Sequence, residues 1–327
     1  MTQSIKKIGV FTSGGDSSGM NAAIRAVVRS AIYHEVEVVG IYRGYEGMIE
    51  GDFISLDVRS VSHIINRGGT ILKSARSKEF MTKEGREKAY NHLKEHQIDA
   101  LVAIGGDGTF TGASIFSTEY NIPIVGLPGT IDNDIFGTDA TIGYDTASNN
   151  AMDAIDKIRD TATSHNRLFF VEVMGRDAGF IALQCAIATG AKAVMLPETH
   201  IEPKDLLTQI RKGKKNRKKS NIVIVGEGNK NGNATELANI IGAMDDSYEI
   251  KVTVLGHIQR GGSPTIKDRV LASRLGVASI DALLDGQKNV MIGQQNNQVC
   301  YVPFEKAIKN ENTLNEELLR VVDILSI

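Results

Sequence analysis

The chain is poor in features that mark several protein classes. Of its 327 residues only two are cysteine, Cys185 and Cys300, which excludes a disulfide scaffold and predicts two reduced thiols. Lys and Arg number 37 against 39 Asp and Glu, so the net charge is −2. A polycation that binds nucleic acid through its overall charge is thereby excluded. We expect a cytoplasmic protein without a nucleic-acid partner.

Long apolar runs are also missing. The N-terminus enters a strand-like segment without the apolar core of a signal peptide. The most apolar long stretch, residues 179–196, contains Gln184 and Lys192 and falls short of a bilayer span. We expect a buried helix followed by a strand there, and no membrane partner. The length itself predicts about two domains.

Short apolar runs alternate with longer helical patterns. Strands are predicted at residues 8–11, 37–42, 100–104, 124–127, 168–173, 193–196 and 221–225, and helices at 21–33, 83–96 and 148–161. Such alternation, with nearly continuous apolar strands, is typical of mainly parallel sheets covered on both faces. One run, residues 211–219, holds seven basic residues in nine, and it is either a solvated helix end or an anion site.

Glycines gather where predicted strands end. The turns at residues 13–16, 105–109 and 128–130 each follow a strand, and we expect each to open toward the N-terminus of a helix. Ligands of open α/β sheets bind outside the carboxyl ends of strands, and helix N-termini favour anions. One such turn alone is usually only a tight connection. Three of them predict a phosphate-binding crevice lined with backbone N–H groups.

Carboxylates accompany these glycines. Asp107 lies within one turn, and Asp132 and Asp134 follow another, whereas neither a Walker A sequence nor a proper G-x-G-x-x-G is present. Phosphoryl transfer needs carboxylates that hold a metal, amides around the phosphates, a base for the acceptor hydroxyl and cations for the developing charge. Each aspartate alone is more often a turn former or a helix cap.

Basic residues supply the remaining groups. Arg76, Arg176 and Arg260 lie in glycine-flanked loops from which a guanidinium can reach a phosphate, and His257 stands three residues before Arg260. Any one of these arginines alone would more simply form a surface ion pair. Arg25 and Arg29 are spaced i, i+4 on an otherwise apolar helix, which makes either a solvated face or a cationic pair at an interface.

These strings closely resemble those of the bacterial-type ATP-dependent 6-phosphofructokinases. The resemblance runs from about residue 5 to about residue 300. The matching strings are GVFTSGGD at residues 9–16, IGGDGT at 104–109, PGTIDND at 128–134, VMGR at 173–176 and GHIQRGG at 256–262. The GGDG turn also occurs in NAD kinases and lipid kinases, whereas PGTIDND together with GHIQRGG is highly specific.

The resemblance implies phosphorylation of fructose 6-phosphate at its C1 hydroxyl by MgATP, giving fructose 1,6-bisphosphate and ADP in glycolysis. Asp132 would be the general base, Thr130 would position the reacting groups, and Arg76 and Arg176 would neutralise the transferring phosphoryl. Asp107 and Asp134 would serve Mg²⁺. The implied ATP site comprises Gly15, Arg76, Ser77, Gly106, Asp107, Gly108 and Thr109. The implied sugar-phosphate site comprises Thr130, Ile131, Asp132, Arg167, Met174, Gly175, Arg176, Glu227, Lys251, His257 and Arg260.

The resemblance also implies an architecture. The fold would be α/β, with two doubly wound, mainly parallel-sheet domains and the active site in the cleft between them. The ATP domain would comprise residues 1–142 and 258–308, and the sugar-phosphate domain residues 143–257 and 309–327. Arg167 and the residue at position 251 serve a neighbouring subunit in this family, so a homotetramer with shared active sites is implied. Pyrophosphate-using relatives carry Asp at the position of Gly108 and Lys at that of Gly129, so ATP is the implied donor.

The chain departs from the family at two sites. Lys251 stands where the family usually has Arg, which keeps the charge but loses the planar two-pronged contact with phosphate. In the implied effector site Val58 replaces an Arg, beside Arg59, and Lys192 replaces a Glu thought to meet the effector's metal. We therefore expect an altered response to ADP. The candidate effector residues are Arg25, Arg29, Arg59, Arg159, Lys192 and Lys218.

Two other functions fit these residues less well. A kinase of another hydroxyl compound is disfavoured because Glu227, His257 and Arg260 occupy the positions that hold the sugar phosphate. A catalytically inactive sugar-phosphate-binding regulator would be favoured by loss of Asp107 or Asp132, and both are present.

Overall fold

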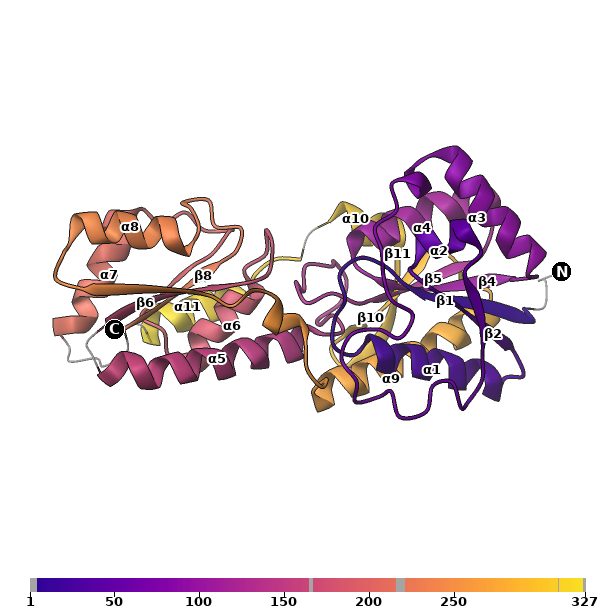
Figure 1. Cartoon of the computed structure of the whole chain (residues 1–327), viewed down its shortest axis with the longest axis horizontal. Helices are drawn as coiled ribbons and strands as arrows, with labels where there is room; N and C mark the ends of the chain where they lie inside the picture. Colours follow the sequence, from indigo (N-terminus) through magenta and orange to yellow (C-terminus); the bar gives the residue numbers. More distant parts are fainter. Residues whose placement is uncertain (1–4, 165–166, 216–220, 311, 326–327) are drawn as a thin grey trace. The chain divides into compact units, whose positions relative to one another are not determined.

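The computed structural model describes residues 5–164, 167–215, 221–310 and 312–325, with the backbone alone at 163–164 and 212–215. The chain divides into two compact units. Unit 1 comprises residues 1–131, 135–146 and 260–312, and unit 2 comprises residues 132–134, 147–259 and 313–327. Each unit contains a sheet covered by helices on both faces (Figure 1).

Unit 1 is built on a seven-stranded sheet in the described part of the chain, with the order β11-β10-β5-β4-β1-β2-β3. Its strands are β1 (Lys7–Thr12), β2 (Glu37–Ile41), β3 (Phe53–Leu56), β4 (Ala100–Gly105), β5 (Ile124–Pro128), β10 (Val290–Gln295) and β11 (Gln298–Pro303). The five inner strands pair in parallel, and β3 and β11 pair antiparallel at the two edges. The core strands β1, β4 and β5 are almost wholly buried, which their continuous apolar sequences require.

Two groups of helices cover this sheet. They are α1 (Met20–Tyr33), α2 (Tyr45–Glu50), α3 (Lys83–Glu95), α4 (Asp107–Tyr120), α9 (Ile266–Leu284) and α10 (Phe304–Lys309), with the 3₁₀ turn η1 at Glu79–Met81. α1 and α9 pack together on one face, over a cluster that includes Val10, Val27 and Leu275. The remaining helices lie on the other face, over a cluster that includes Phe110, Phe116 and Phe304 (Figure 1).

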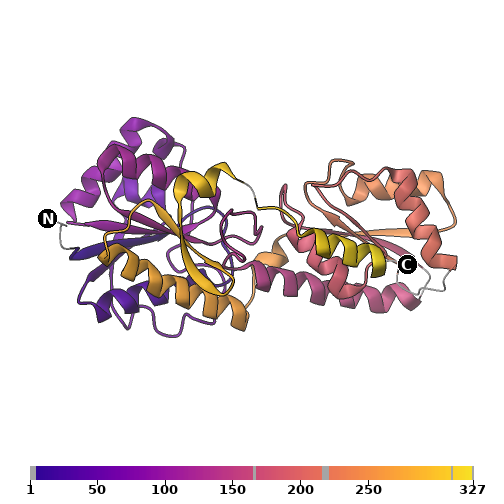
Figure 2. The ribbon, with the colours of Figure 1, turned by 180° about the vertical axis from the view of Figure 1, so that it is seen from behind.

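Unit 2 is built on a four-stranded parallel sheet in the described residues, with the order β7-β8-β6-β9. Its strands are β6 (Arg167–Val173), β7 (Ala193–Met195), β8 (Ile222–Gly226) and β9 (Glu249–Val254). Its helices are α5 (Tyr144–Ser164), α6 (Phe180–Thr189), α7 (Pro203–Lys215), α8 (Ala234–Met244) and α11 (Glu316–Leu325), and the 3₁₀ turn η2 spans Gly256–Arg260. α11 lies beside α6, as the view from behind shows (Figure 2). α7 and α8 cover the opposite face.

The start of α5 is fixed by a buried carboxylate. Asp268 on α9 is 1% exposed and accepts hydrogen bonds from the backbone N–H of Gly143 and from both N–H and hydroxyl of Thr146. Burial raises the pKa of Asp268, and the hydrogen bonds from Thr146 and Gly143 oppose that shift. A carboxylate at a helix N-terminus satisfies N–H groups that have no partner within the helix.

The predicted α/β class with mainly parallel sheets is confirmed, and each predicted strand and helix is present with ends shifted by a few residues. One expectation is wrong: the turn at residues 128–130 does not open toward a helix, because the next helix begins only at Tyr144. The chain instead folds back on itself, since Ile142 N–H donates to the Pro128 carbonyl at 2.8 Å. No helix of the described residues is long and apolar enough to cross a bilayer.

Candidate active site

In unit 1 the predicted ATP-site glycines follow β1 and β4, two neighbouring strands whose onward connections lead to opposite sides of the sheet. β1 pairs with β2 on one side and with β4 on the other, which makes a topological switch point between β1 and β4. Hydrogen bonds tie the strand ends together, from Ser13 N–H to the Ile104 carbonyl at 3.0 Å and from Gly129 N–H to the Gly105 carbonyl at 2.9 Å. Open α/β sheets bind ligands at such a point.

The turn after β4 has no room for side chains at one position and open space at another. A Cβ at Gly105 would lie 2.3 Å from Oγ1 of Thr109 and 2.5 Å from the Ser13 carbonyl, so only glycine fits. That threonine hydroxyl in turn donates to Ser13 at 3.2 Å. A Cβ at Gly108 would meet nothing within 4 Å. The first turn of α4 therefore has open space beside it at Gly108, and a helix N-terminus with such space suits a phosphate.

Asp107 opens helix α4 in the middle of this turn. Partial desolvation raises the pKa of its carboxyl, and a bound cation would reverse that shift. Among the described residues no group of three or more His, Cys, Asp or Glu side chains could hold a metal ion. Mg²⁺ typically binds one or two carboxylates together with substrate phosphates. A carboxylate beside phosphate-binding amides therefore fits Mg²⁺ held jointly with a nucleotide.

Among the other predicted residues of unit 1, Arg260 and Thr130 lie beside these turns. Arg260 donates from Nη1 to the Asp16 carbonyl at 3.0 Å, and a Cβ at Gly15 would lie 2.8 Å from that nitrogen. A Cβ at Gly106 would lie 3.7 Å from Cβ of Thr130. The Ile131 side chain is 0% exposed, so only its backbone could contact a ligand. Arg76 is exposed and Ser77 half-buried, in the segment that leads to η1.

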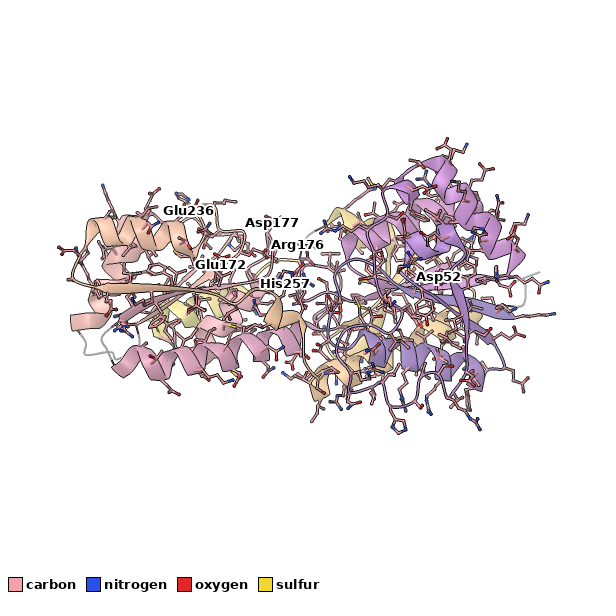
Figure 3. All side chains as sticks on the ribbon, in the orientation of Figure 1. Asp52, Glu172, Arg176, Asp177, Glu236 and His257 are labelled. Atoms are coloured by element: carbon pink, nitrogen blue, oxygen red, sulfur yellow. The ribbon has the colours of Figure 1, made fainter. Side chains whose placement is uncertain are left out.

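In unit 2 the segments that follow β6 and β9 lie side by side. β6 pairs in parallel with β9, so the two segments leave the sheet at the same, carboxyl end of the strands, where ligands of open α/β sheets bind. Residues 174–176 follow β6, and η2 follows β9 with His257 exposed. Figure 3 shows Arg176 and His257 at this end of the sheet.

A buried carboxylate and an exposed guanidinium form an ion pair here. Nε of Arg176 lies 3.6 Å from Oδ2 of Asp132, with side chains 58% and 3% exposed respectively. Arg176 adopts a left-handed backbone with φ of 50°, a conformation that is uncommon outside glycine. Its N–H donates to Oε2 of Glu227 at 3.0 Å, and the N–H of Gly175 donates to the same oxygen at 3.3 Å. Glu227 therefore fixes the loop that carries the guanidinium.

Two predicted phosphate ligands of unit 2 share one carboxylate. Arg167 on β6 and Lys251 on β9 both pair with Glu249, at 3.1 Å from Nε and 3.0 Å from Nζ. Hydrogen bonds from Arg167 and then from Lys251 lower the pKa of Glu249. Two cations from adjacent strands therefore lie on the same face, where a second anion could approach both.

A profile of the phosphofructokinase family matches residues 7–283 of the 327. The chain belongs to the phosphofructokinase family. Over 99% of both chains it is 57% identical to ATP-dependent 6-phosphofructokinase 2 of Bacteroides thetaiotaomicron. It is 54% identical to ATP-dependent 6-phosphofructokinase 1 of Thermus thermophilus over 99% of this chain and 100% of that one. The resemblance to this family noted in the sequence is confirmed.

A solved structure of phosphofructokinase from Saccharomyces cerevisiae has the same fold. The TM-score is 0.89 at 36% identity, and the match covers 98% of this chain and 47% of the yeast chain. The chain thus spans about half the length of that yeast protein, whereas it spans nearly the whole of its bacterial relatives. The expectation of an ATP-dependent sugar-phosphate kinase agrees with the names of those bacterial relatives.

Three of the candidate effector residues lie in unit 1. Arg25 and Arg29 line a pocket of about 440 Å³ between α1 and α9, together with Tyr33 and Asp281. Desolvation and then the charge of Arg29 lower the pKa of Arg25, as expected for two neighbouring cations. Arg59 is exposed in the turn after β3.

The other candidate effector residues lie elsewhere in the chain. Arg159 on α5 donates to the Thr189 carbonyl, and its Nε lies 3.8 Å from Oδ1 of Asp156. Lys192 is 1% exposed and its Nζ donates to Oδ1 of Asn221 at 3.2 Å, so it faces the interior of unit 2 and not a solvent-filled effector site. Lys218 lies outside the described residues.

Sequence reasoning assigned no role to Gln259, although the residue lies within the GHIQRGG string. The structure buries this side chain completely and places it between the two segments that follow β6 and β9. A polar residue between His257 and Arg260 was the only signal in the sequence, and its partner, the N–H of Met174, is 85 residues away.

Proposed function

We propose that this chain transfers the γ-phosphoryl group of ATP to the C1 hydroxyl of fructose 6-phosphate. The products are fructose 1,6-bisphosphate and ADP, and the step belongs to glycolysis in the cytoplasm. The observation that carries the proposal is the nearly full-length identity with bacterial proteins named ATP-dependent 6-phosphofructokinase. The glycine-lined turns of unit 1 and the Asp132–Arg176 pair of unit 2 supply the chemistry that such a transfer requires.

In this proposal Asp132 is the general base. It takes the proton of the C1 hydroxyl while that oxygen bonds to the γ-phosphorus, and the bond from phosphorus to the β–γ bridging oxygen breaks to release ADP. Arg176, 3.6 Å from the base, neutralises charge on the transferring group, and Arg76 has the same role. Thr130 orients the reacting groups.

In this proposal the substrates bind at the carboxyl ends of the strands of the two sheets. The ATP phosphates bind the N–H groups around Gly15, Gly106 and Gly108, with Ser77 and Thr109 at the margins. Asp107 and Asp134 hold Mg²⁺, which supplies charge neutralisation for the phosphates when bound. The sugar binds Met174, Gly175 and Glu227. Its 6-phosphate binds His257, Arg260, Arg167 and Lys251, the last two from a neighbouring subunit of a homotetramer.

The deciding experiment is a coupled assay with fructose 6-phosphate, ATP and Mg²⁺ on the wild type and on Asp132→Ser. We expect kcat to fall by several orders of magnitude, with both Michaelis constants changing little, because a base acts in the transition state more than in binding. Asp134→Ser serves as a matched carboxylate variant. It should lose activity through loss of the metal, as the wild type should on treatment with EDTA. A wild type inactive with these substrates, or an Asp132→Ser variant of normal kcat, would overturn the proposal.

We also propose an altered effector response. The cations Arg25, Arg29, Arg59 and Arg159 would still attract an anion, whereas a lysine at 192 cannot hold the metal of ADP–Mg. We therefore expect weak activation by ADP. Sigmoidal kinetics for the sugar that ADP converts to hyperbolic kinetics would contradict this proposal.

A further inference from the structure

One buried amide joins the two segments that follow β6 and β9 in unit 2. The side chain of Gln259 is 0% exposed. Its Oε1 accepts a hydrogen bond from the N–H of Met174 at 3.3 Å, and its Nε2 donates to the carbonyl of Gly256 at 3.0 Å. One side chain thus fixes the distance between the loop after β6 and the turn η2 after β9.

This position requires a group that both donates and accepts. An amide presents an oxygen to one partner and an NH₂ to the other, whereas a carboxylate only accepts and an aliphatic side chain does neither. A buried backbone group that loses its only side-chain partner is costly, because no water replaces that partner. Glutamine at 259 is therefore dictated by the hydrogen-bonding groups of the two loops.

The segments that Gln259 joins are those to which the sugar-phosphate residues belong. Met174 begins the loop in which Glu227 holds the next two N–H groups, those of Gly175 and Arg176. η2 carries His257 two residues before Gln259. Asn150 on α5 adds a longer contact, 3.4 Å from Nδ2 to the Gln259 carbonyl, on the outer side of the turn. Of these contacts, only the Gln259 side chain reaches both segments.

We propose that Gln259 is a positioning residue that sets the separation of the Met174–Arg176 loop from His257, and thereby the affinity for the sugar phosphate. The proposal rests on the proposed function, because it takes these segments to bind fructose 6-phosphate. Gln259 does not touch the substrate. It acts through the backbone of Met174 and through the turn that carries His257, so binding of ATP is independent of it.

The test compares Gln259→Leu, Gln259→Glu and a matched control, Asn221→Leu. Asn221 is also a buried amide beside the same sheet, at the opposite end of β8 from these loops. For Gln259→Leu we expect the KM for fructose 6-phosphate to rise about tenfold, since a lost hydrogen bond is worth about that factor. The KM for ATP should stay within about twofold. Asn221→Leu removes a hydrogen-bond partner of the buried Lys192 and so lowers stability too, yet it should leave both Michaelis constants unchanged because it lies away from these loops.

Gln259→Glu gives a signature that general loss of stability cannot give. A buried carboxyl has a raised pKa, and only its protonated form can donate to the Gly256 carbonyl. The ratio of the variant's sugar KM to that of the wild type should therefore fall toward one as the pH is lowered from 8 to 6. The proposal would be overturned by a KM ratio that does not change with pH. It would also be overturned if the KM for ATP rose together with the KM for fructose 6-phosphate.

Direct binding separates this proposal from the proposed function. Isothermal titration of fructose 6-phosphate into the wild type and into Gln259→Leu measures affinity without turnover. If the wild type binds and phosphorylates the sugar but the Leu variant binds it equally well, only the role of Gln259 fails. If the wild type neither binds nor phosphorylates the sugar, both proposals fail. A weakened Kd in the Leu variant and an unchanged Kd in Asn221→Leu would support the positioning role.

Discussion

Arg176 pairs with a buried carboxylate, because its Nε lies 3.6 Å from Oδ2 of Asp132. The side chain of Arg176 is 58% exposed and that of Asp132 only 3% exposed. An ion pair with one exposed partner is held weakly, because water screens the guanidinium. Its loop, in contrast, is fixed through the backbone by Glu227. The guanidinium can therefore leave the carboxylate by side-chain rotation alone, while the backbone of its loop stays in place.

Removal of this charge should slow the chemical step. We expect Arg176→Gln to lower kcat about 100-fold, the usual effect of losing one stabilising group in a transition state. Arg176→Lys should retain part of the rate, because it keeps the charge but not the fork. Steady-state kinetics with both substrates would check this. Equal kcat values for the Gln and Lys variants would show that charge is not what Arg176 contributes.

Gly108 and Gly105 should respond in opposite ways to substitution. A side chain at Gly108 meets nothing within 4 Å, and Asp is favourable in the first turn of a helix, so Gly108→Asp should fold normally. Its carboxylate would repel the ATP phosphates, and we expect the KM for ATP to rise at least tenfold. Gly105→Ala should instead lower the melting temperature, because its Cβ would collide with Thr109 and Ser13. Thermal unfolding and ATP kinetics on both variants check the contrast.

Lys251 should bind phosphate less firmly than an arginine would. Nζ of Lys251 lies 3.0 Å from Oε1 of Glu249, so a single point charge is shared between this carboxylate and any phosphate. Lys251→Arg adds a planar fork that can contact both, and we expect a lower KM for fructose 6-phosphate with kcat nearly unchanged. Lys251→Met, without the charge, should raise the same constant. An unchanged constant in Lys251→Arg would refute the argument.

Asp245 should stabilise the fold in a pH-dependent way. Hydrogen bonds from Ser247 and then from Arg211 lower the pKa of this carboxyl to about 2. An unfolded aspartate titrates near about 4, so the stabilisation is present above that pH and is lost as the pH falls toward 2. The melting temperatures of wild type and Asp245→Asn should therefore differ at pH 6 and converge between about pH 4 and pH 2. A difference that stays constant down to pH 2 would contradict this account.

The sequence predicts the buried elements better than the exposed ones. The continuous apolar runs of β1, β4 and β8 identify these strands directly. β3, β9 and β11 are not predicted, because they lie at sheet edges and expose many side chains. β10 is not predicted either, although it is an inner strand whose first four residues are buried. The absent helix after residue 130 has a tertiary cause. Thr141 donates to the Thr130 carbonyl at 2.7 Å, and Asp268, far along the chain, fixes where α5 begins.

The candidate site residues also differ in how well the sequence predicts them. Glycines and aspartates at strand ends identify the candidate phosphate-binding turns, because close backbone approach and charge can be recognised in the local sequence. Gln259 and Glu249 leave no such trace, since their partners Met174 and Arg167 become neighbours only when β6 pairs with β9. The burial of Lys192 likewise depends on its contact with Asn221, across a pair of strands.

The chain's own thiols are chemically quiet, which makes the protein a convenient scaffold for spectroscopic labels. Burial raises the pKa of Cys185 to about 12, and burial followed by the charge of Asp139 raises that of Cys300, so little thiolate forms at neutral pH. A single cysteine introduced at an exposed position should react with a maleimide dye far faster than either native thiol. The fluorescence of such a dye could then be recorded without prior removal of the natural cysteines.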